Sequence, residues 1–103
     1  MFAWVVYDIT NNRIRLRVAD TCKDFGLVRF QKSVFFGEIT ASTFERMGEA
    51  LDRAAGPREG EERAETDSVL VFTLCDTCLS RKVVIGRGFD ENDYRKRRYL
   101  IIG

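Results

Sequence analysis

The chain opens with an unbroken run of strand-forming residues that stops abruptly at a carboxylate. Residues 2–7 are all apolar or aromatic, and Asp8 follows them directly. Such a run is typical of a buried strand, so we expect a first strand over residues 2–8. The chain contains no histidine, which leaves Asp8 with few rivals as a catalytic group.

The hydrophobic period changes from 2 to about 3.6 and back along the chain, which predicts strands and helices in alternation. Apolar stripes and capping residues mark two helices. The segment 57–67 is nearly all charged or small and is predicted to be a mobile, solvated loop. The helices are predicted from Asn11 or Asn12 to Gly26 and from Thr40 or Ser42 to Gly56, and the further strands over residues 29–36, 68–74, 81–86 and 99–102.

We read these strands and two helices as the ferredoxin-like plan, an α+β fold in which a βαββαβ chain forms an antiparallel sheet with two helices on one face. The plan accounts for residues 1–88 as one domain. Residues 89–103 form a tail whose final strand, over residues 99–102, lies beyond the closed pattern. Because a strand needs a neighbour, we expect this one to pair with an edge of a second copy of the chain.

The composition indicates the cellular setting and the kind of partner. The longest apolar run is far shorter than the roughly 20 residues of a membrane span, and no cationic segment precedes it as in a secretory signal. Three cysteines are too few for a disulfide framework, so we expect a cytoplasmic protein without membrane contact. Of the 17 basic residues, 13 are arginine, whose shape suits bidentate phosphate contact and favours a polyanionic partner.

Asp8 has two interpretations. An aspartate after a strand often caps a turn. It can instead be a metal ligand, although one carboxylate is a minimal site for Mg²⁺. If the first strand lies near the axis of a two-fold dimer, Asp8 from each protomer can share one hydrated ion. Such an ion would activate water and polarise a phosphate, in place of the general base that a chain without histidine lacks.

Arginine and aromatic side chains are the candidate phosphate contacts. Arg15 and Arg17 lie in the first predicted helix but point in different directions, so they are either separate phosphate contacts or a solvated helix surface. Arg29 begins the predicted strand over residues 29–36, and Phe35 lies on the same side of it. Such a strand face forms either a nucleic-acid platform or a dimer interface.

Cys75 and Cys78 form a Cys-x-x-Cys motif, which is typical of zinc and redox sites. With one other cysteine and no histidine, one copy of the chain cannot complete an ordinary four-ligand zinc site. The motif is also far from the N-terminal strand that precedes the helix of thioredoxin-like sites. We therefore expect inert thiols in a turn or in the core.

Four segments carry a family resemblance: residues 5–10, 15–19, 25–37 and 83–86. In this order and at this spacing they closely resemble the small CRISPR-associated adaptation proteins, also described as CRISPR-associated endoribonucleases. These proteins are the ferredoxin-like partners of the CRISPR integrase. The resemblance covers about residues 1–88.

The resemblance implies a homodimer that takes part in spacer acquisition, binds DNA or RNA and partners the integrase subunit. It also implies an endonuclease activity on RNA or double-stranded DNA that depends on Mg²⁺, with Mn²⁺ as an alternative. The residues it implicates are Tyr7 and Asp8 in catalysis, Asp8 of each protomer in metal binding, and Arg15, Arg17, Arg29 and Phe35 in nucleic-acid binding.

Two classes of function remain open. The first is a dimeric, metal-dependent phosphodiesterase that uses Asp8. The second is a non-catalytic adaptor that grips duplex DNA and bridges integrase dimers, with Asp8 as a turn residue. Family members often carry further acidic residues after the first strand, where this chain has Asn11 and Asn12, so its metal site is leaner.

Overall fold

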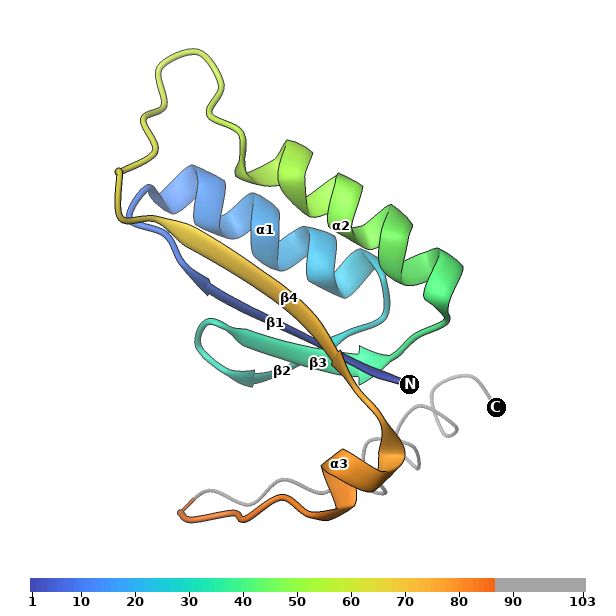
Figure 1. The fold of residues 1–103 in the computed structure, drawn as a ribbon. Helices are drawn as coiled ribbons and strands as arrows, with labels where there is room; N and C mark the ends of the chain where they lie inside the picture. The colour runs from blue at the N-terminus through green and yellow to red at the C-terminus, as the bar shows by residue number, and fades with distance from the viewer. Residues whose placement is uncertain (87–103) are drawn as a thin grey trace.

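The computed structural model describes residues 1–86, which form a four-stranded antiparallel sheet with two long helices on one side (Figure 1). The order βαββαβ, followed by a short third helix, confirms the predicted ferredoxin-like α+β class. The elements are β1 (Phe2–Asp8), α1 (Asn12–Asp24), β2 (Val28–Gln31), β3 (Val34–Glu38), α2 (Ala41–Ala55), β4 (Ser68–Leu74) and α3 (Asp76–Ser80).

β1 is an inner strand of the sheet, whose order is β2-β3-β1-β4. It pairs with β3 on one side, and on the other it pairs with β4 from Phe2, opposite Leu74, to Asp8, opposite Ser68. The predicted first strand is therefore confirmed. Because successive side chains of a strand point to opposite faces, β1 contributes to both sides of the sheet.

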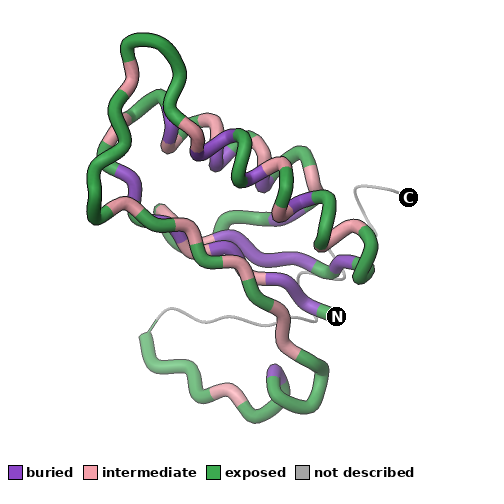
Figure 2. Tube along the Cα trace, turned by 45° about the horizontal axis from the view of Figure 1, so that its top comes forward, coloured by how far each residue is buried: buried purple, intermediate pink, exposed green. Residues whose placement is uncertain are grey.

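The main core lies between the sheet and the two long helices. Ala3, Val5 and Tyr7 of β1 are buried on this side. The helices present the apolar stripes that their period predicts, and Figure 2 shows the buried residues gathered on their inner sides and on the central strands. The buried helix residues are Ile14, Val18, Ala19 and Cys22 of α1, and Met47, Leu51, Ala54 and Ala55 of α2.

Capping residues set the ends of both long helices. The side-chain oxygen of Asn11 accepts the N–H groups of Arg13 and Ile14 at 2.9 and 3.0 Å, and Thr40 caps α2. Gly26 follows α1 with a φ of 81°, a conformation that glycine adopts without strain. Within residues 1–86, no helix has the length and apolar character needed to cross a membrane.

The opposite face of the sheet is only partly covered. Phe2 and Phe36 are buried there together with Leu79 of α3, and we call this group the α3 cluster. Farther along this face, apolar side chains of the edge strand β4 remain in solvent. Leu70 is 59 % exposed and Phe72 is 41 % exposed. Within residues 1–86, this open face therefore carries an apolar patch that remains exposed.

The strand predicted over residues 29–36 is a hairpin. β2 and β3 pair antiparallel and are joined by a turn at residues 32–33. The register shifts between Arg29 and Gln31, so Phe30 forms a bulge and Gln31 no longer shares a side with Arg29. The prediction of one strand was wrong because the turn contains no glycine, proline or asparagine, the residues that mark tight turns.

The strand predicted over residues 81–86 was also wrong. β4 leads directly into α3, and the chain after α3 pairs with no strand in the described part of the molecule. Val83 and Ile85 are consequently exposed. Apolar alternation produces a strand only where a sheet edge is within reach, and α3 carries the chain away from the edge of β4. The tail over 89–103 and its predicted strand over 99–102 lie outside the described residues.

Truncation of a core leucine should cost far more stability than truncation of a surface leucine on the neighbouring helix. Leu51 of α2 is 2 % exposed, whereas Leu16 of α1 is 62 % exposed. We expect Leu51→Ala to lower the free energy of unfolding by about 2–5 kcal/mol, because it leaves a cavity. The matched control Leu16→Ala should change it by less than about 0.5 kcal/mol. Urea denaturation followed by circular dichroism measures both, and equal losses would contradict this core.

Candidate metal site and nucleic-acid interface

Asp8 ends β1 on the open face of the sheet. Its side chain lies on the same face as that of Val6, two residues earlier, and its register partner in β4 is Ser68. The residue is exposed, and within residues 1–86 its carboxylate has no hydrogen-bond or ion-pair partner. A turn cap would accept a nearby backbone N–H, but the N–H of Thr10 donates to Asp67 instead, at 3.1 Å. Asp8 is thus available to a ligand.

Residues 1–86 of a single copy offer too little to hold a divalent metal. In the described part of the chain, no group of three or more His, Cys, Asp or Glu side chains comes together. Mg²⁺ prefers oxygen ligands and is usually held by one or two carboxylates together with water and substrate oxygens. Asp8 supplies one exposed carboxylate, an oxygen ligand of the kind that this ion takes.

Tyr7 lies on the other face of β1 from Asp8. Its ring is buried beneath the helices, with 3 % of the residue exposed, and stacks on Phe35 at 6.3 Å between centroids. Burial raises the pKa of the Tyr7 phenol, while the positive charge of Arg29 opposes the rise. Within one copy, Tyr7 is a core residue that supports the end of β1 from below. Its predicted catalytic role remains a prediction.

Arg29 and Phe35 face each other across β2 and β3. They are register partners, and the Cζ atom of Arg29 lies 5.0 Å from the centre of the Phe35 ring, which is a cation–π contact. Phe35 is completely buried, so it has no free face on which a base could stack. Arg29 is exposed. The guanidinium is thus held on the edge strand β2 by Phe35 and interacts with the Tyr7 phenol.

Arg15 contacts the chain directly after β1. It donates to the backbone carbonyl of Ile9 at 3.3 Å and to the side-chain oxygen of Asn12. These bonds hold the β1–α1 connection, which also carries Asp8 at its start. Arg15 remains half-exposed, so its predicted contact with nucleic acid remains a prediction.

Arg17 forms several tertiary hydrogen bonds and an ion pair. Its two terminal nitrogens each donate to a carboxylate oxygen of Glu61 at 2.8 Å, in a bidentate ion pair. It also donates to the backbone carbonyls of Ala54 and Gly56, at 3.1 and 3.0 Å. The predicted phosphate contact of Arg17 remains a prediction, but its guanidinium is already occupied in joining α1 to the end of α2.

The same network anchors the acidic segment 57–67. The segment has no helix or strand, as predicted, but the side chain of Glu61 is only 6 % exposed, and Asp67 accepts the N–H and hydroxyl of Thr10 at 3.1 Å. Sequence reasoning missed Glu61. The one available signal was the excess of acidic residues in this segment, and a separation of 44 residues from Arg17 says nothing about pairing.

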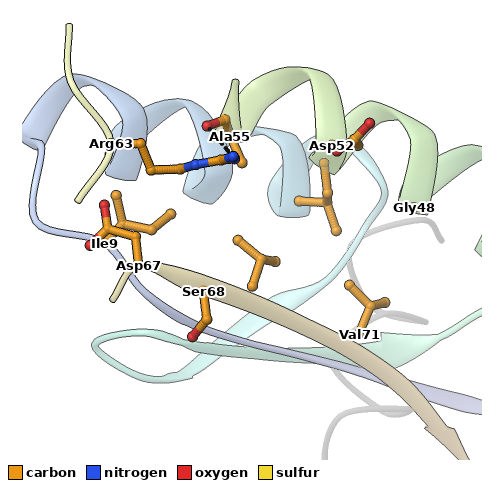
Figure 3. A pocket seen from close by; sticks show the side chains of 10 residues that line it. Ile9, Gly48, Asp52, Ala55, Arg63, Asp67, Ser68 and Val71 are labelled. Carbon is orange, nitrogen blue, oxygen red and sulfur yellow. Dashed lines mark hydrogen bonds between the residues drawn. The ribbon is translucent and has the colours of Figure 1, made fainter. Parts of the chain in front are cut away.

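A cleft of about 320 Å³ lies between α2 and β4 on the helix side of the sheet. Figure 3 shows Arg63 and Asp67 at one end and Val71 toward the other. The polar groups at this end are already used, because Arg63 donates to the carbonyl of Ala55 at 3.3 Å and Asp67 bonds Thr10 and Ala64. The cleft does not include Asp8 and is separate from the strand-end site.

Three features define the class of this protein: the antiparallel βαββαβ sheet, the open apolar face and the carboxylate at the end of β1. The chain is a small ferredoxin-like protein with a candidate phosphodiester site at the end of a central strand. The family model of the CRISPR associated protein Cas2 matches residues 1–82. This chain therefore belongs to the Cas2 family, which confirms the resemblance found in the sequence.

Individual relatives agree with this assignment. The CRISPR-associated endoribonuclease Cas2 of Korarchaeum cryptofilum is 44 % identical over 84 residues, which cover 82 % of this chain and 83 % of the relative. A CRISPR-associated endonuclease Cas1/endonuclease Cas2 fusion of Thermoproteus tenax is 41 % identical over 54 residues, 52 % of this chain and 20 % of the fusion. The crystal structure of Streptococcus pyogenes Cas2 at pH 6.5 has a TM-score of 0.59 and 28 % identity, covering 84 % of this chain and 100 % of that one.

The Arg17–Glu61 pair should make stability depend on pH in the acid range. The Arg17 guanidinium and the backbone N–H of Arg58 lower the pKa of Glu61 from 4.5 to about 2. Because the folded pKa lies below the unfolded one, the pair stabilises the fold above about pH 4.5 and loses this contribution as the pH falls toward 2.

We therefore expect the melting temperature of Glu61→Gln to fall less steeply than that of the wild type as the pH is lowered from about 5 to 3. Glu62→Gln, which alters an exposed neighbour, should follow the wild type. Thermal melts at a series of pH values measure this. Parallel curves for Glu61→Gln and the wild type would exclude the pair as a source of acid sensitivity.

Proposed function

We propose that this chain acts in CRISPR spacer acquisition as a homodimer that hydrolyses phosphodiester bonds of RNA or DNA with Mg²⁺, or alternatively Mn²⁺. The ion is held between Asp8 of the two protomers. The observation that carries the proposal is the exposed carboxylate of Asp8, which ends an inner strand on the open face and has no partner within residues 1–86. The names of the relatives, which are endoribonucleases, support the reaction class.

The apolar patch of the open face supports the dimer. Leu70 and Phe72 lie exposed on β4, next to Val6 and Trp4 in the register of the sheet. Covering such a patch with the same patch of a second copy removes apolar surface from water, and a two-fold contact is the commonest way to do so. Asp8 lies on this same face, so the contact that buries the patch also brings the two carboxylates toward one axis.

Asp8, Arg29 and Arg15 have different roles in the proposed reaction. A bound Mg²⁺ would supply an activated water and stabilise the charge that develops on the phosphate. The two Asp8 carboxylates hold the ion and orient it. Arg29, exposed on the edge strand and fixed by Phe35, neutralises a backbone phosphate outside the reacting centre. Arg15 holds the connection that follows Asp8 and so keeps the carboxylate at the end of β1.

The partner is the CRISPR integrase subunit. The fusion from Thermoproteus tenax joins an endonuclease Cas1 to an endonuclease Cas2 in one chain, which supports a physical association of the two modules. The apolar segment that contains Val83 and Ile85, exposed and without a strand partner in residues 1–86, is suited to pair with an edge supplied from outside the chain.

A second candidate function is a non-catalytic adaptor that binds duplex DNA and bridges integrase dimers. The specific observation that favours it is the small number of metal ligands near Asp8. Asn11 and Asn12 follow β1 where further carboxylates would strengthen metal binding, and no three-ligand group forms within the described residues. Both functions use Arg29 in the same way, so Asp8 distinguishes them.

The first test is Asp8→Asn. We expect it to abolish cleavage of RNA and DNA in Mg²⁺, because the amide keeps the shape but loses the charge that holds the ion. Retention of DNA should be at least as strong as in the wild type. Asp20→Asn on α1, which removes an equal charge from an exposed site, should cut normally. Gel-based cleavage assays with and without EDTA measure this. If the wild type shows no metal-dependent cleavage, the nuclease function is contradicted and the adaptor function is the remaining candidate.

The second test concerns the arginine on the edge strand. Arg29→Gln should reduce the slope of log binding constant against log salt concentration by about 1, because one phosphate contact and its released counterion are lost. Arg46→Gln, on the exposed side of α2, should leave the slope unchanged. Fluorescence anisotropy with a labelled DNA duplex at several salt concentrations measures both, and an unchanged slope for Arg29→Gln would remove this residue from the interface.

A further inference from the structure

Two cysteines meet where the chain leaves the sheet. Cys75 follows β4 and caps α3, and Cys78 lies three residues on, in the first turn of that helix. The sulfur of Cys75 accepts the backbone N–H of Cys78 at 3.4 Å. Both residues are exposed, which agrees with the expected place in a turn rather than in the core. The third cysteine, Cys22, is buried in α1.

The two thiols have unequal acidity. The backbone N–H of Cys78 and then its thiol lower the pKa of Cys75, whereas the sulfur of Cys75 raises the pKa of Cys78. The pair therefore contains one sulfur with a lowered pKa beside one with a raised pKa. Burial raises the pKa of Cys22 to about 12 from 9.0, so its thiolate is scarcer near neutral pH than that of an ordinary cysteine.

The turn is also held in place by its neighbour. Leu79, directly after Cys78, is buried in the α3 cluster against Phe2 and Phe36. Cys75 is the N-cap residue, with an extended backbone, and its sulfur lies 3.4 Å from the backbone nitrogen of Cys78 in the first turn. A disulfide needs Cβ atoms about 3.5–4.5 Å apart, so the turn closes when the two sulfurs join, and Leu79 anchors it to the sheet meanwhile.

We propose that Cys75 and Cys78 form a redox-active dithiol that exchanges with small-molecule disulfides. The thiolate of Cys75 attacks one sulfur of the small disulfide, which gives a mixed disulfide and releases one small thiol. The thiol of Cys78 then loses its proton, and its sulfur attacks that of Cys75 and displaces the second small thiol. The protein pair loses two electrons and two protons, and the small disulfide is reduced to two thiols. This site is independent of the function proposed for Asp8.

The test uses the full chain and oxidised glutathione as the probe. After incubation and denaturation, the remaining thiols are alkylated and the protein is mapped by mass spectrometry. We expect the wild type to lose two hydrogens, to contain a Cys75–Cys78 bond and to retain one free thiol, at Cys22. Cys22→Ala should oxidise at the wild-type rate. Cys75→Ser should slow the first reaction with glutathione at least about tenfold, because it removes the more acidic sulfur.

Three outcomes would overturn the proposal. The first is exchange in Cys75→Ser at the wild-type rate. The second is a disulfide that joins two copies, visible as a dimer on a non-reducing gel. The third is zinc in the purified wild type, at about one ion per two copies, with thiols that react only after chelation. That last result would assign the two pairs of a dimer to a shared metal site instead.

Discussion

The pairing of β1 with a strand on each side is the constraint on which the rest of the molecule depends. Because β1 lies inside the sheet, its alternate side chains serve two different surfaces. Ala3, Val5 and Tyr7 bind the helices to the sheet, while Phe2 and Val6 face the other way. A slip by one residue in this pairing would exchange the two sets and move Asp8 from the open face into the core. The strand therefore sets both the core and the position of the candidate site.

The arginines acquire different roles from their surroundings. Arg17 is held by Glu61 and by carbonyls at the end of α2, so it stabilises the packing of the helix layer. Arg29 stacks on a buried ring but is itself an exposed residue. A partly buried ion pair of good geometry gains from hydrogen bonds on both partners, whereas an exposed arginine can reach a phosphate. Two arginines of the same chain therefore have different roles: Arg17 stabilises the structure, and Arg29 is a candidate for nucleic-acid binding.

Much of the fold could be predicted because its signals are local. The caps at Asn11, Thr40 and Gly26 act within one helical turn, and the apolar stripes of both helices repeat every three or four residues. The hairpin of β2 and β3 could not be found in this way, because its turn residues are compatible with a continuous strand. The same holds for the sulfurs of Cys75 and Cys78, whose exposure depends on how α3 docks through Leu79.

The sequence by itself determined the ferredoxin-like class, the family and the place of Asp8 at the end of the first strand, because these follow from hydrophobic period, from capping residues and from short segments in a specific order. The tertiary structure alone decided that Tyr7 and Phe35 are buried, that Arg17 belongs to Glu61, and that Asp8 has no partner within residues 1–86. The physical reason is that burial and pairing depend on contacts between residues far apart in the chain. Such contacts exist only once the sheet and its helices have packed.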